Sequence, residues 1–155
     1  MKRVGIVRVA RSDWGHTQGL YEALNGRADF IPYNSTDMRT YRVIVIFGDR
    51  WEMAHAAALA IFARVPILHL HGGEQTVHVI DQRYRKAISQ MADIHCVAHD
   101  VHRQRLITQD IDPTTIHVTG AIGLDRYRRL GASKGQVATT LTLDVARPWA
   151  MILLH

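Results

Sequence analysis

Short runs of β-branched and apolar residues alternate along the chain with longer stretches in which apolar residues recur at helical spacing. The runs predict strands at residues 4–9, 42–47, 67–70, 94–98 and 116–118, with a weak strand near 30–33. The stretches between them predict helices from about 13 or 16 to 24, then at 51–64, 80–91 and 100–109. Repeated strand–helix units with right-handed connections predict an α/β fold, a Rossmann-like doubly wound parallel sheet. Its ligand is expected beyond the carboxyl ends of the strands.

The last part of the chain differs in composition from the rest. Residues 1–130 are predicted to form the α/β domain, 131–148 a polar, threonine-rich linker, and 149–155 a further strand. We interpret this strand as the start of a second domain that the chain lacks. Because it has no partner of its own, we expect it to pair with a sheet edge, in its own molecule or a neighbour's, which would make a homo-oligomer.

The balance of charges favours acidic partners. Lys and Arg number 19 against 14 Asp and Glu, a net charge of +5 that suits nucleotides, sugar phosphates or nucleic acid. The helix predicted at 80–91 carries Arg83, Arg85 and Lys86 opposite its apolar face, and a solvated basic face explains such a stripe more often than nucleic-acid binding does.

The sequence also indicates the compartment. The single cysteine, Cys96, lies in an apolar run, which gives no disulfide framework and predicts a buried thiol. No run approaches the roughly 18 consecutive apolar residues of a membrane span. We therefore expect a cytoplasmic protein that makes no membrane contact.

Polar clusters follow three of the predicted strands, at 11–13 (Arg-Ser-Asp), 48–50 (Gly-Asp-Arg) and 71–74 (His-Gly-Gly-Glu). A doubly wound sheet brings such strand ends to one crevice. Arg11 and Arg50 could hold a diphosphate there, or they could be solvated surface arginines. The paired glycines at 72 and 73 remove side chains from the crevice wall and allow close approach of a ligand.

Three carboxylates each have a catalytic and a structural explanation. Asp49 suits a general base or a partner in a phosphate clamp, but it could equally cap the helix that follows. Glu74 can take or give a proton if burial raises its pKa, or it is a turn glutamate in water. Asp81 opens a helix, and an N-cap is the leading explanation of its position.

Ten histidines raise the question of a metal site. Six of them lie in one stretch: His69, His71, His78, His95, His99 and His102. Their spacing does not bring three ligands onto one face, so we expect no metal, and neither a P-loop nor a GxGxxG motif indicates a nucleotide cofactor. His71, at the end of a strand, is the best functional candidate among them.

Four blocks of residues resemble, in order, the hydrolysing UDP-N-acetylglucosamine 2-epimerases of sialic-acid-type sugar synthesis. They lie at 48–53, 66–74, 80–88 and 118–125, and 10–15 is similar to that family's first phosphate-side loop. The resemblance implies one half of a glycosyltransferase-B-like fold, with a UDP-sugar bound between two Rossmann-type domains. It also implies a reaction without metal or cofactor, in which UDP is eliminated across C1 and C2 of the sugar and water is then added.

The same resemblance implies roles for individual residues. Those on the catalytic side are Asp49, Glu74, Asp81, His71, which stands where some members have the catalytic glutamate, and His155, which would end the next domain's first strand. Those on the substrate side are Arg11, Asp13, Arg50, Gly72, Gly73 and Arg85.

The chain also departs from the family pattern. Between the first helix and the Gly-Asp-Arg strand only residues 25–42 remain of a segment several tens of residues longer, and the second domain is missing. Lys86 replaces a frequent histidine, and Gln82 a frequent acid. Two hypotheses remain: a catalytic half that another domain or subunit completes, or a non-catalytic module that binds a nucleotide, a nucleic acid or a protein.

Overall fold

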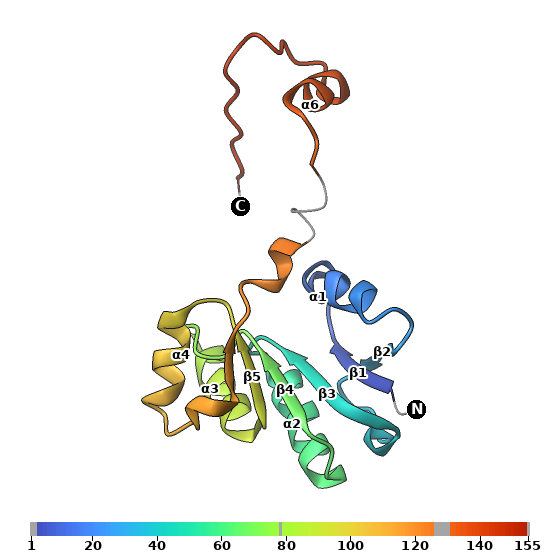
Figure 1. The fold of residues 1–155 in the computed structure, drawn as a ribbon, viewed down its shortest axis with the longest axis vertical. Helices are drawn as coiled ribbons and strands as arrows, with labels where there is room; N and C mark the ends of the chain where they lie inside the picture. Colours follow the sequence, from blue (N-terminus) through green and yellow to red (C-terminus); the bar gives the residue numbers. More distant parts are fainter. Residues whose placement is uncertain (1–2, 78, 126–130, 155) are drawn as a thin grey trace.

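The computed structural model describes residues 3–77, 79–125 and 131–154, and its centre is a six-stranded parallel sheet (Figure 1). The strands are β1 (Arg3–Arg8), β2 (Ala28–Pro32), β3 (Tyr41–Phe47), β4 (Ile67–Leu70), β5 (Ile94–Val97) and β6 (Ile116–Val118). Their order across the sheet is β2-β1-β3-β4-β5-β6. The chain moves in one direction from β1 to β2 and in the other from β3 onward, so the switch point lies between β1 and β3. The predicted doubly wound parallel sheet is confirmed.

Four helices lie between the strands: α1 (Arg11–Ala23), α2 (Trp51–Ala63), α3 (Asp81–Met91) and α4 (Asp100–Ile107). The helix α6 (Lys134–Leu141) follows the last strand, and the short 3-10 turns are η1 (Met38–Thr40), η2 (Pro113–Thr115) and η3 (Ile122–Leu124). The first four correspond to the helices that the apolar spacing predicts. No helix in the described part of the chain is both long and apolar enough to cross a membrane.

Alternate residues of the central strand β3 serve the two faces of the sheet. Ile44 and Ile46 pack with Met53 of α2 in one core cluster. Val45 packs with Leu20 of α1 in a second cluster on the other face. A strand covered on both faces needs apolar residues at successive positions, which explains the continuous apolar run of this segment.

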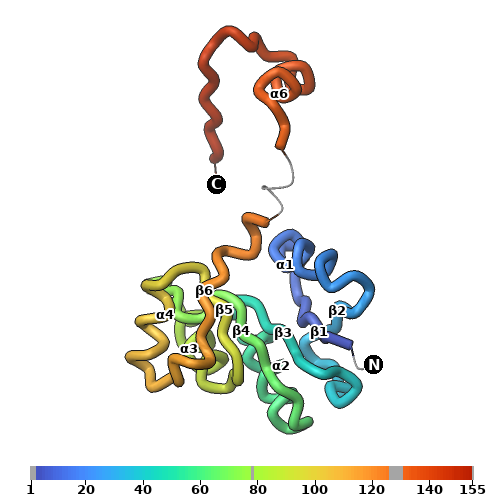
Figure 2. The backbone as a smooth tube through the Cα atoms, viewed as in Figure 1, coloured from blue at the N-terminus to red at the C-terminus, as the bar shows by residue number. Residues whose placement is uncertain are grey.

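The last part of the chain differs from the expectation. The predicted linker contains α6, whose start is a capping box: Gln136 N donates to Ser133 Oγ at 3.3 Å, and Ser133 N donates to Gln136 Oε1 at 2.7 Å. Residues 149–154, expected to form a strand, have no regular secondary structure and pair with no strand of the described sheet, so pairing with a neighbouring molecule stays a prediction. This segment and α6 lie away from the sheet (Figure 2).

Two histidines lie in the core of the sheet. His69 on β4 is 0% exposed and His95 on the neighbouring β5 is 1% exposed. Burial disfavours a charged imidazole, and it lowers the pKa of His69 to about 3 and lowers that of His95. Neither ring nitrogen of His95 has a hydrogen-bond partner among the described residues.

We expect the free energy of unfolding to fall as the pH drops below about 6.5, the pKa of an unfolded histidine. Below this pH the histidines of the unfolded chain bind protons, whereas those buried in the folded protein stay neutral. Each buried histidine therefore lowers the free energy of unfolding by up to about 1.4 kcal/mol per pH unit. Urea unfolding at pH 7 and pH 5 measures this loss. His95→Leu should reduce the pH dependence, whereas an exposed control, His117→Leu, should leave it unchanged. An equal slope in His95→Leu and the wild type would contradict the argument.

Candidate active site

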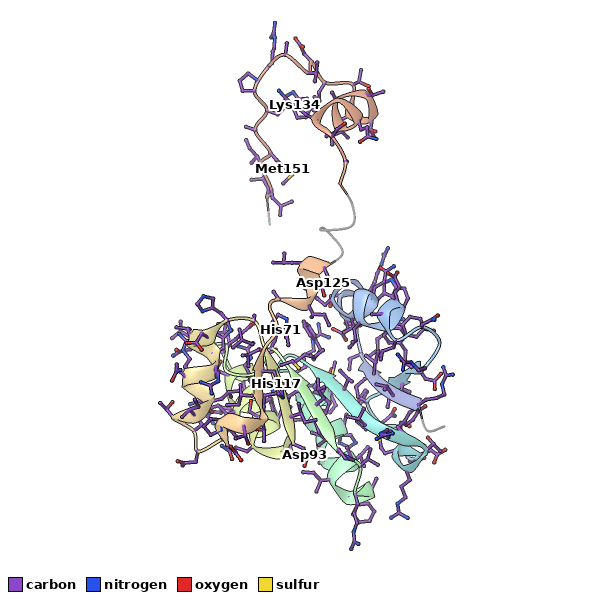
Figure 3. All side chains as sticks on the ribbon, in the orientation of Figure 1. His71, Asp93, His117, Asp125, Lys134 and Met151 are labelled. Atoms are coloured by element: carbon purple, nitrogen blue, oxygen red, sulfur yellow. The ribbon has the colours of Figure 1, made fainter. Side chains whose placement is uncertain are left out.

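The carboxyl ends of β1, β3 and β4 lie at one edge of the sheet, beside the switch point. His71, directly after β4, is at this edge, and Asp93, just before β5, is at the opposite one (Figure 3). The backbone N–H of Gly48 donates to the carbonyl of Leu70 at 3.1 Å. The turns after β3 and β4 are therefore joined, and two of the three predicted polar clusters are neighbours.

Asp49 and Arg85 form an ion pair that links the turn after β3 to α3. Arg85 Nη2 donates to Asp49 Oδ2, and the Arg85 side chain is only 8% exposed. Arg85 Nε and Nη1 are buried without a hydrogen-bond partner among the described residues. Since a buried N–H without a partner is costly, these donors favour an anionic ligand. The expected exposed stripe of Arg83, Arg85 and Lys86 is wrong for Arg85, while the other two are exposed.

His71 and Glu74 form a second pair at the same edge, with His71 Nδ1 2.5 Å from Glu74 Oε1. The hydrogen bond from His71 is the main cause that lowers the pKa of Glu74, against an opposing effect of burial. The charges of His71, Arg85 and His102 lower it further. The condition for proton transfer by Glu74 itself, a pKa raised by burial, is therefore not met, because the hydrogen bond outweighs burial and favours the ionised carboxylate.

An ionised Glu74 can only accept, so the proton of this hydrogen bond belongs to His71 Nδ1. Nε2 is the ring nitrogen left to take or give a proton, and it has no partner among the described residues. A carboxylate behind an imidazole fixes its tautomer and stabilises the imidazolium that forms when the ring takes a proton. The arrangement suits proton transfer at His71 Nε2, with Glu74 as its support.

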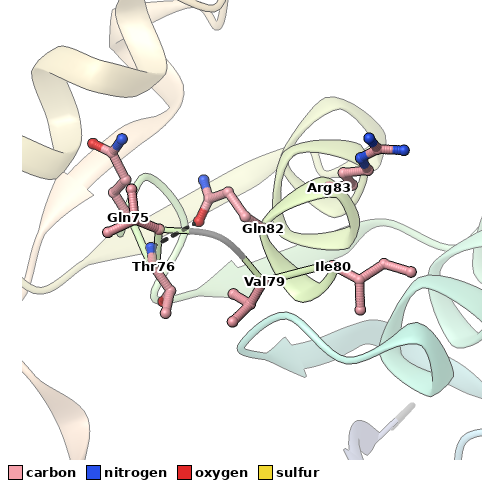
Figure 4. Close-up of a pocket in the computed structure, with 7 residues that line it drawn as sticks. Gln75, Thr76, Val79, Ile80, Gln82 and Arg83 are labelled. Atoms are coloured by element: carbon pink, nitrogen blue, oxygen red, sulfur yellow. Dashed lines mark hydrogen bonds between the residues drawn. The ribbon is translucent and has the colours of Figure 1, made fainter.

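Gln82 holds the loop that carries Glu74 against the start of α3. Its Oε1 accepts from Thr76 N at 3.1 Å, and its Nε2 donates to the carbonyl of Glu74 at 3.3 Å. Figure 4 shows the first of these bonds beside a hollow of about 580 Å³ that Gln82, Arg83 and residues of the loop line. An acid at position 82 could accept from Thr76 but could not donate to this carbonyl.

An aromatic contact extends the site toward α1. Phe47, the last residue of β3, stacks on His16 of α1 with ring centroids 4.9 Å apart, and it meets the His71 ring in a T-shaped pair with centroids 5.0 Å apart. Sequence reasoning did not identify His16, because nothing in the spacing of α1 distinguishes it from a surface histidine. His71 is also one of the residues that line an apolar cavity of about 400 Å³ between α1 and the sheet.

The residues on the predicted phosphate side have separate roles. Asp13 is 4% exposed, and its Oδ2 accepts from Val9 N at 2.9 Å and Ala10 N at 2.8 Å. This carboxylate therefore shapes the turn after β1. Arg11 is exposed and Arg50 half-buried, and neither makes an ion pair with another described residue. Their guanidinium groups remain available for an anion.

The structure excludes helix capping for two of the carboxylates. Arg50, not Asp49, is the N-cap residue of α2, and Ile80, not Asp81, is the N-cap residue of α3. Asp81 is half-buried in the first turn of α3, without a hydrogen bond to a described residue. His155 lies outside the described residues.

The two glycines of the loop are required by packing inside the protein. A Cβ on Gly72 would lie 3.0 Å from His69 Nδ1 and 3.1 Å from Ser89 Oγ. A Cβ on Gly73, whose φ is +75°, would overlap the carbonyl of His102 in α4. The tight packing brings α4 close to Glu74. Among the described residues no three His, Cys, Asp or Glu side chains lie together as a metal site.

Comparison with known proteins matches residues 25–155 to the family model described as UDP-N-acetylglucosamine 2-epimerase. The chain belongs to this family. It is 39% identical over 101 residues to the UDP-N,N'-diacetylbacillosamine 2-epimerase (hydrolyzing) of Legionella pneumophila, a match that covers 65% of this chain and 26% of that protein. It is 40% identical over 114 residues to the GDP/UDP-N,N'-diacetylbacillosamine 2-epimerase (hydrolyzing) of Campylobacter jejuni, covering 73% of this chain and 30% of that protein.

A solved member of the 2-epimerase family shares the fold. The UDP-GlcNAc 2-epimerase from Neisseria meningitidis, bound to UDP-GlcNAc, superposes with a TM-score of 0.69 at 13% identity. The match covers 90% of this chain and 53% of that one. The chain thus corresponds to about half of a glycosyltransferase-B-like fold, and its aligned part to between a quarter and a third of the two curated relatives.

Proposed function

We propose that this chain supplies the proton-transfer wall of a hydrolysing UDP-sugar 2-epimerase, and that a second Rossmann-type domain or subunit completes the nucleotide side. One observation carries the proposal: this chain, a member of the family, has the His71–Glu74 pair and the Asp49–Arg85 ion pair together at the carboxyl ends of β3 and β4, beside the switch point. The names of the relatives and the UDP-GlcNAc in the Neisseria structure support a UDP-linked amino sugar as substrate.

In the proposed first step a base removes the proton from C2 of the sugar. The C–H electron pair forms a C1=C2 double bond while the C1–O bond breaks, and UDP leaves with that bonding pair. In the second step water adds its oxygen to C1, and a proton returns to C2 on the opposite face. His71 Nε2 is the proposed acceptor in the first step, because Glu74 stabilises the resulting imidazolium.

The leaving diphosphate needs cations, and three arginines near these strand ends can supply them. Arg11 begins α1 and Arg50 caps α2, so each lies at a helix N-terminus, where the helix dipole also favours an anion. Arg85 has two buried N–H donors that no described residue uses. Asp49 holds Arg85 in place through their ion pair. Asp81, in the first turn of α3, is the remaining candidate for donating the proton that returns to C2 in the second step.

UDP is expected to raise the melting temperature of the chain. At a UDP concentration of 100 times Kd the stabilisation is about 2.7 kcal/mol, or about 5–10 °C for a domain of this size. Uridine, which lacks the diphosphate, should give little shift. Arg11→Ala should reduce the shift without lowering the melting temperature of the free protein, because this side chain is exposed. Thermal unfolding with each ligand measures both effects.

Equal shifts with UDP and uridine, or none with either, would contradict a diphosphate site at these strand ends. If UDP raises the melting temperature but the chain releases no UDP from UDP-N-acetylglucosamine when a second domain is supplied, the result would instead favour the hypothesis of a non-catalytic nucleotide-binding module.

A further inference from the structure

His69 connects the turn that carries Asp49 to α3 through the interior of the protein. Its ring is fully buried, with Nε2 2.9 Å from the carbonyl of Gly48 and Nδ1 3.1 Å from Ser89 Oγ. Gly48 is the last residue before Asp49, and Ser89 lies one helical turn after Arg85 on α3. The histidine thus spans the same two elements that the Asp49–Arg85 ion pair joins at the site.

The chemistry of the two neighbours fixes the tautomer of this ring. A carbonyl can only accept, so Nε2 carries the proton and donates to Gly48. Nδ1 is then the acceptor and takes the hydroxyl proton of Ser89. Burial lowers the pKa of His69 to about 3, so the ring stays neutral and both bonds persist throughout the physiological range.

The result is a ladder with two rungs between the turn after β3 and one face of α3. The outer rung is the Asp49–Arg85 ion pair, and the inner rung runs from Gly48 through His69 to Ser89. A further hydrogen bond, from Gly48 N–H to the carbonyl of Leu70, holds Gly48 against β4. The left-handed φ of +82° at Gly48 turns the chain so that Asp49 faces Arg85.

Gly72 gives independent evidence for the inner rung. A Cβ at this position would press on both His69 Nδ1 and Ser89 Oγ. The backbone after β4 therefore packs directly on the His69–Ser89 bond, so this bond also supports the loop that carries His71 and Glu74.

We propose that His69 is a positioning residue of the 2-epimerase site, which holds the Asp49 carboxylate and the Arg85 guanidinium in register through its hydrogen bonds to Gly48 and Ser89. The role rests on the proposed function, because it acts on residues assigned to that reaction. It requires no contact between His69 and the substrate.

The test compares His69→Leu, which cannot donate to Gly48, with His69→Gln, whose amide N–H can occupy the place of Nε2. His95→Leu is the matched control: His95 is equally buried on the next strand, but its nitrogens bind no described residue. The first readout is hydrogen exchange of the Arg85 guanidinium N–H groups by NMR on the full chain. Exchange is expected to quicken in His69→Leu, to stay slow in His69→Gln, and to be unchanged in His95→Leu.

The second readout is UDP release from UDP-N-acetylglucosamine with a second domain supplied, well below each melting temperature. His69→Leu should lower kcat by about 10–100-fold with little change in KM, since misplacing a reacting group by about 1 Å can cost 10²-fold. His69→Gln should restore most of it. Should His69→Leu fail to fold, Ser89→Ala removes the inner rung alone and should also quicken Arg85 exchange.

Unchanged Arg85 exchange in a folded His69→Leu or Ser89→Ala protein would overturn the positioning role, as would an equal effect in His95→Leu. A wild type that releases no UDP would contradict the proposed function instead. The NMR comparison would then still decide whether His69 holds the ion pair.

Discussion

Replacing His71 by Asn is expected to lower UDP release from UDP-N-acetylglucosamine by about 10²–10⁴-fold, the contribution of a positioned acid–base group. The Asn amide can still donate to Glu74 in place of Nδ1, but it has no atom at the position of Nε2. Glu74→Gln should cause a loss of similar order, because it removes the charge that fixes the tautomer and stabilises the imidazolium. The double variant should lose no more than either single one, since the two groups act as a unit.

The assay supplies the carboxy-terminal half of the Campylobacter relative as the second domain and follows UDP. His117→Asn is a matched control, as His117 is an exposed histidine on β6. Activity that survives His71→Asn but not Glu74→Gln would show that Glu74 itself transfers the proton, contrary to the geometry. No release of UDP by the folded wild type under these conditions would contradict the proposed function as a whole.

Replacing Gly73 by Ala is expected to destabilise the fold more than any other Gly→Ala change in the described loops. Two penalties add at this position: a φ of +75°, and a Cβ that overlaps the backbone carbonyl of His102. The left-handed conformation alone costs about 1–2 kcal/mol for a residue with a side chain. Overpacking against backbone adds about 1–3 kcal/mol.

Gly26 separates the two penalties. Its φ of +74° is nearly the same as that of Gly73, but nothing lies within 4 Å of a Cβ placed there. Gly26→Ala should therefore show the conformational cost alone, and urea midpoints of the two variants give the difference. Equal losses would mean that α4 moves away from the loop at little cost. Gly73→Ala should also weaken UDP release, because the displaced residue directly precedes Glu74.

These expectations share a physical basis. The proposed site residues lie in the turns at the carboxyl ends of the strands or on the helices that follow them, α1 and α3. Hydrogen bonds hold these turns in place: Asp13 binds the turn after β1, His69 the turn after β3, and Gln82 the loop before α3. Fixed dipoles and charges cost little reorganisation during a reaction, which is the main source of catalytic power in many enzymes. The anchoring residues should therefore affect turnover without contacting the substrate.

The sequence predicted the elements of the sheet well. The run at 43–47 is apolar at every position, which only a strand buried on both faces requires, and it is the central β3. The helix α6 was missed because its composition is polar, although Ser133 and Gln136 have the spacing of a capping box. The terminal strand is absent from the single chain because an apolar run becomes a strand only when a neighbouring strand shares its hydrogen bonds.

The sequence alone determined the fold class, the strand ends at which polar clusters gather, and the resemblance to a family that the family model then confirmed. Those properties follow from local patterns and residue identity. Tertiary structure decided the rest. It paired Asp49 with Arg85, buried an arginine that helical spacing placed on the surface, and set the ionisation of Glu74 through a hydrogen bond from His71. It also made a core histidine into a link between the turn after β3 and α3. The energies of charges and hydrogen bonds depend on which groups meet and on how much water is excluded, and only the folded chain defines these.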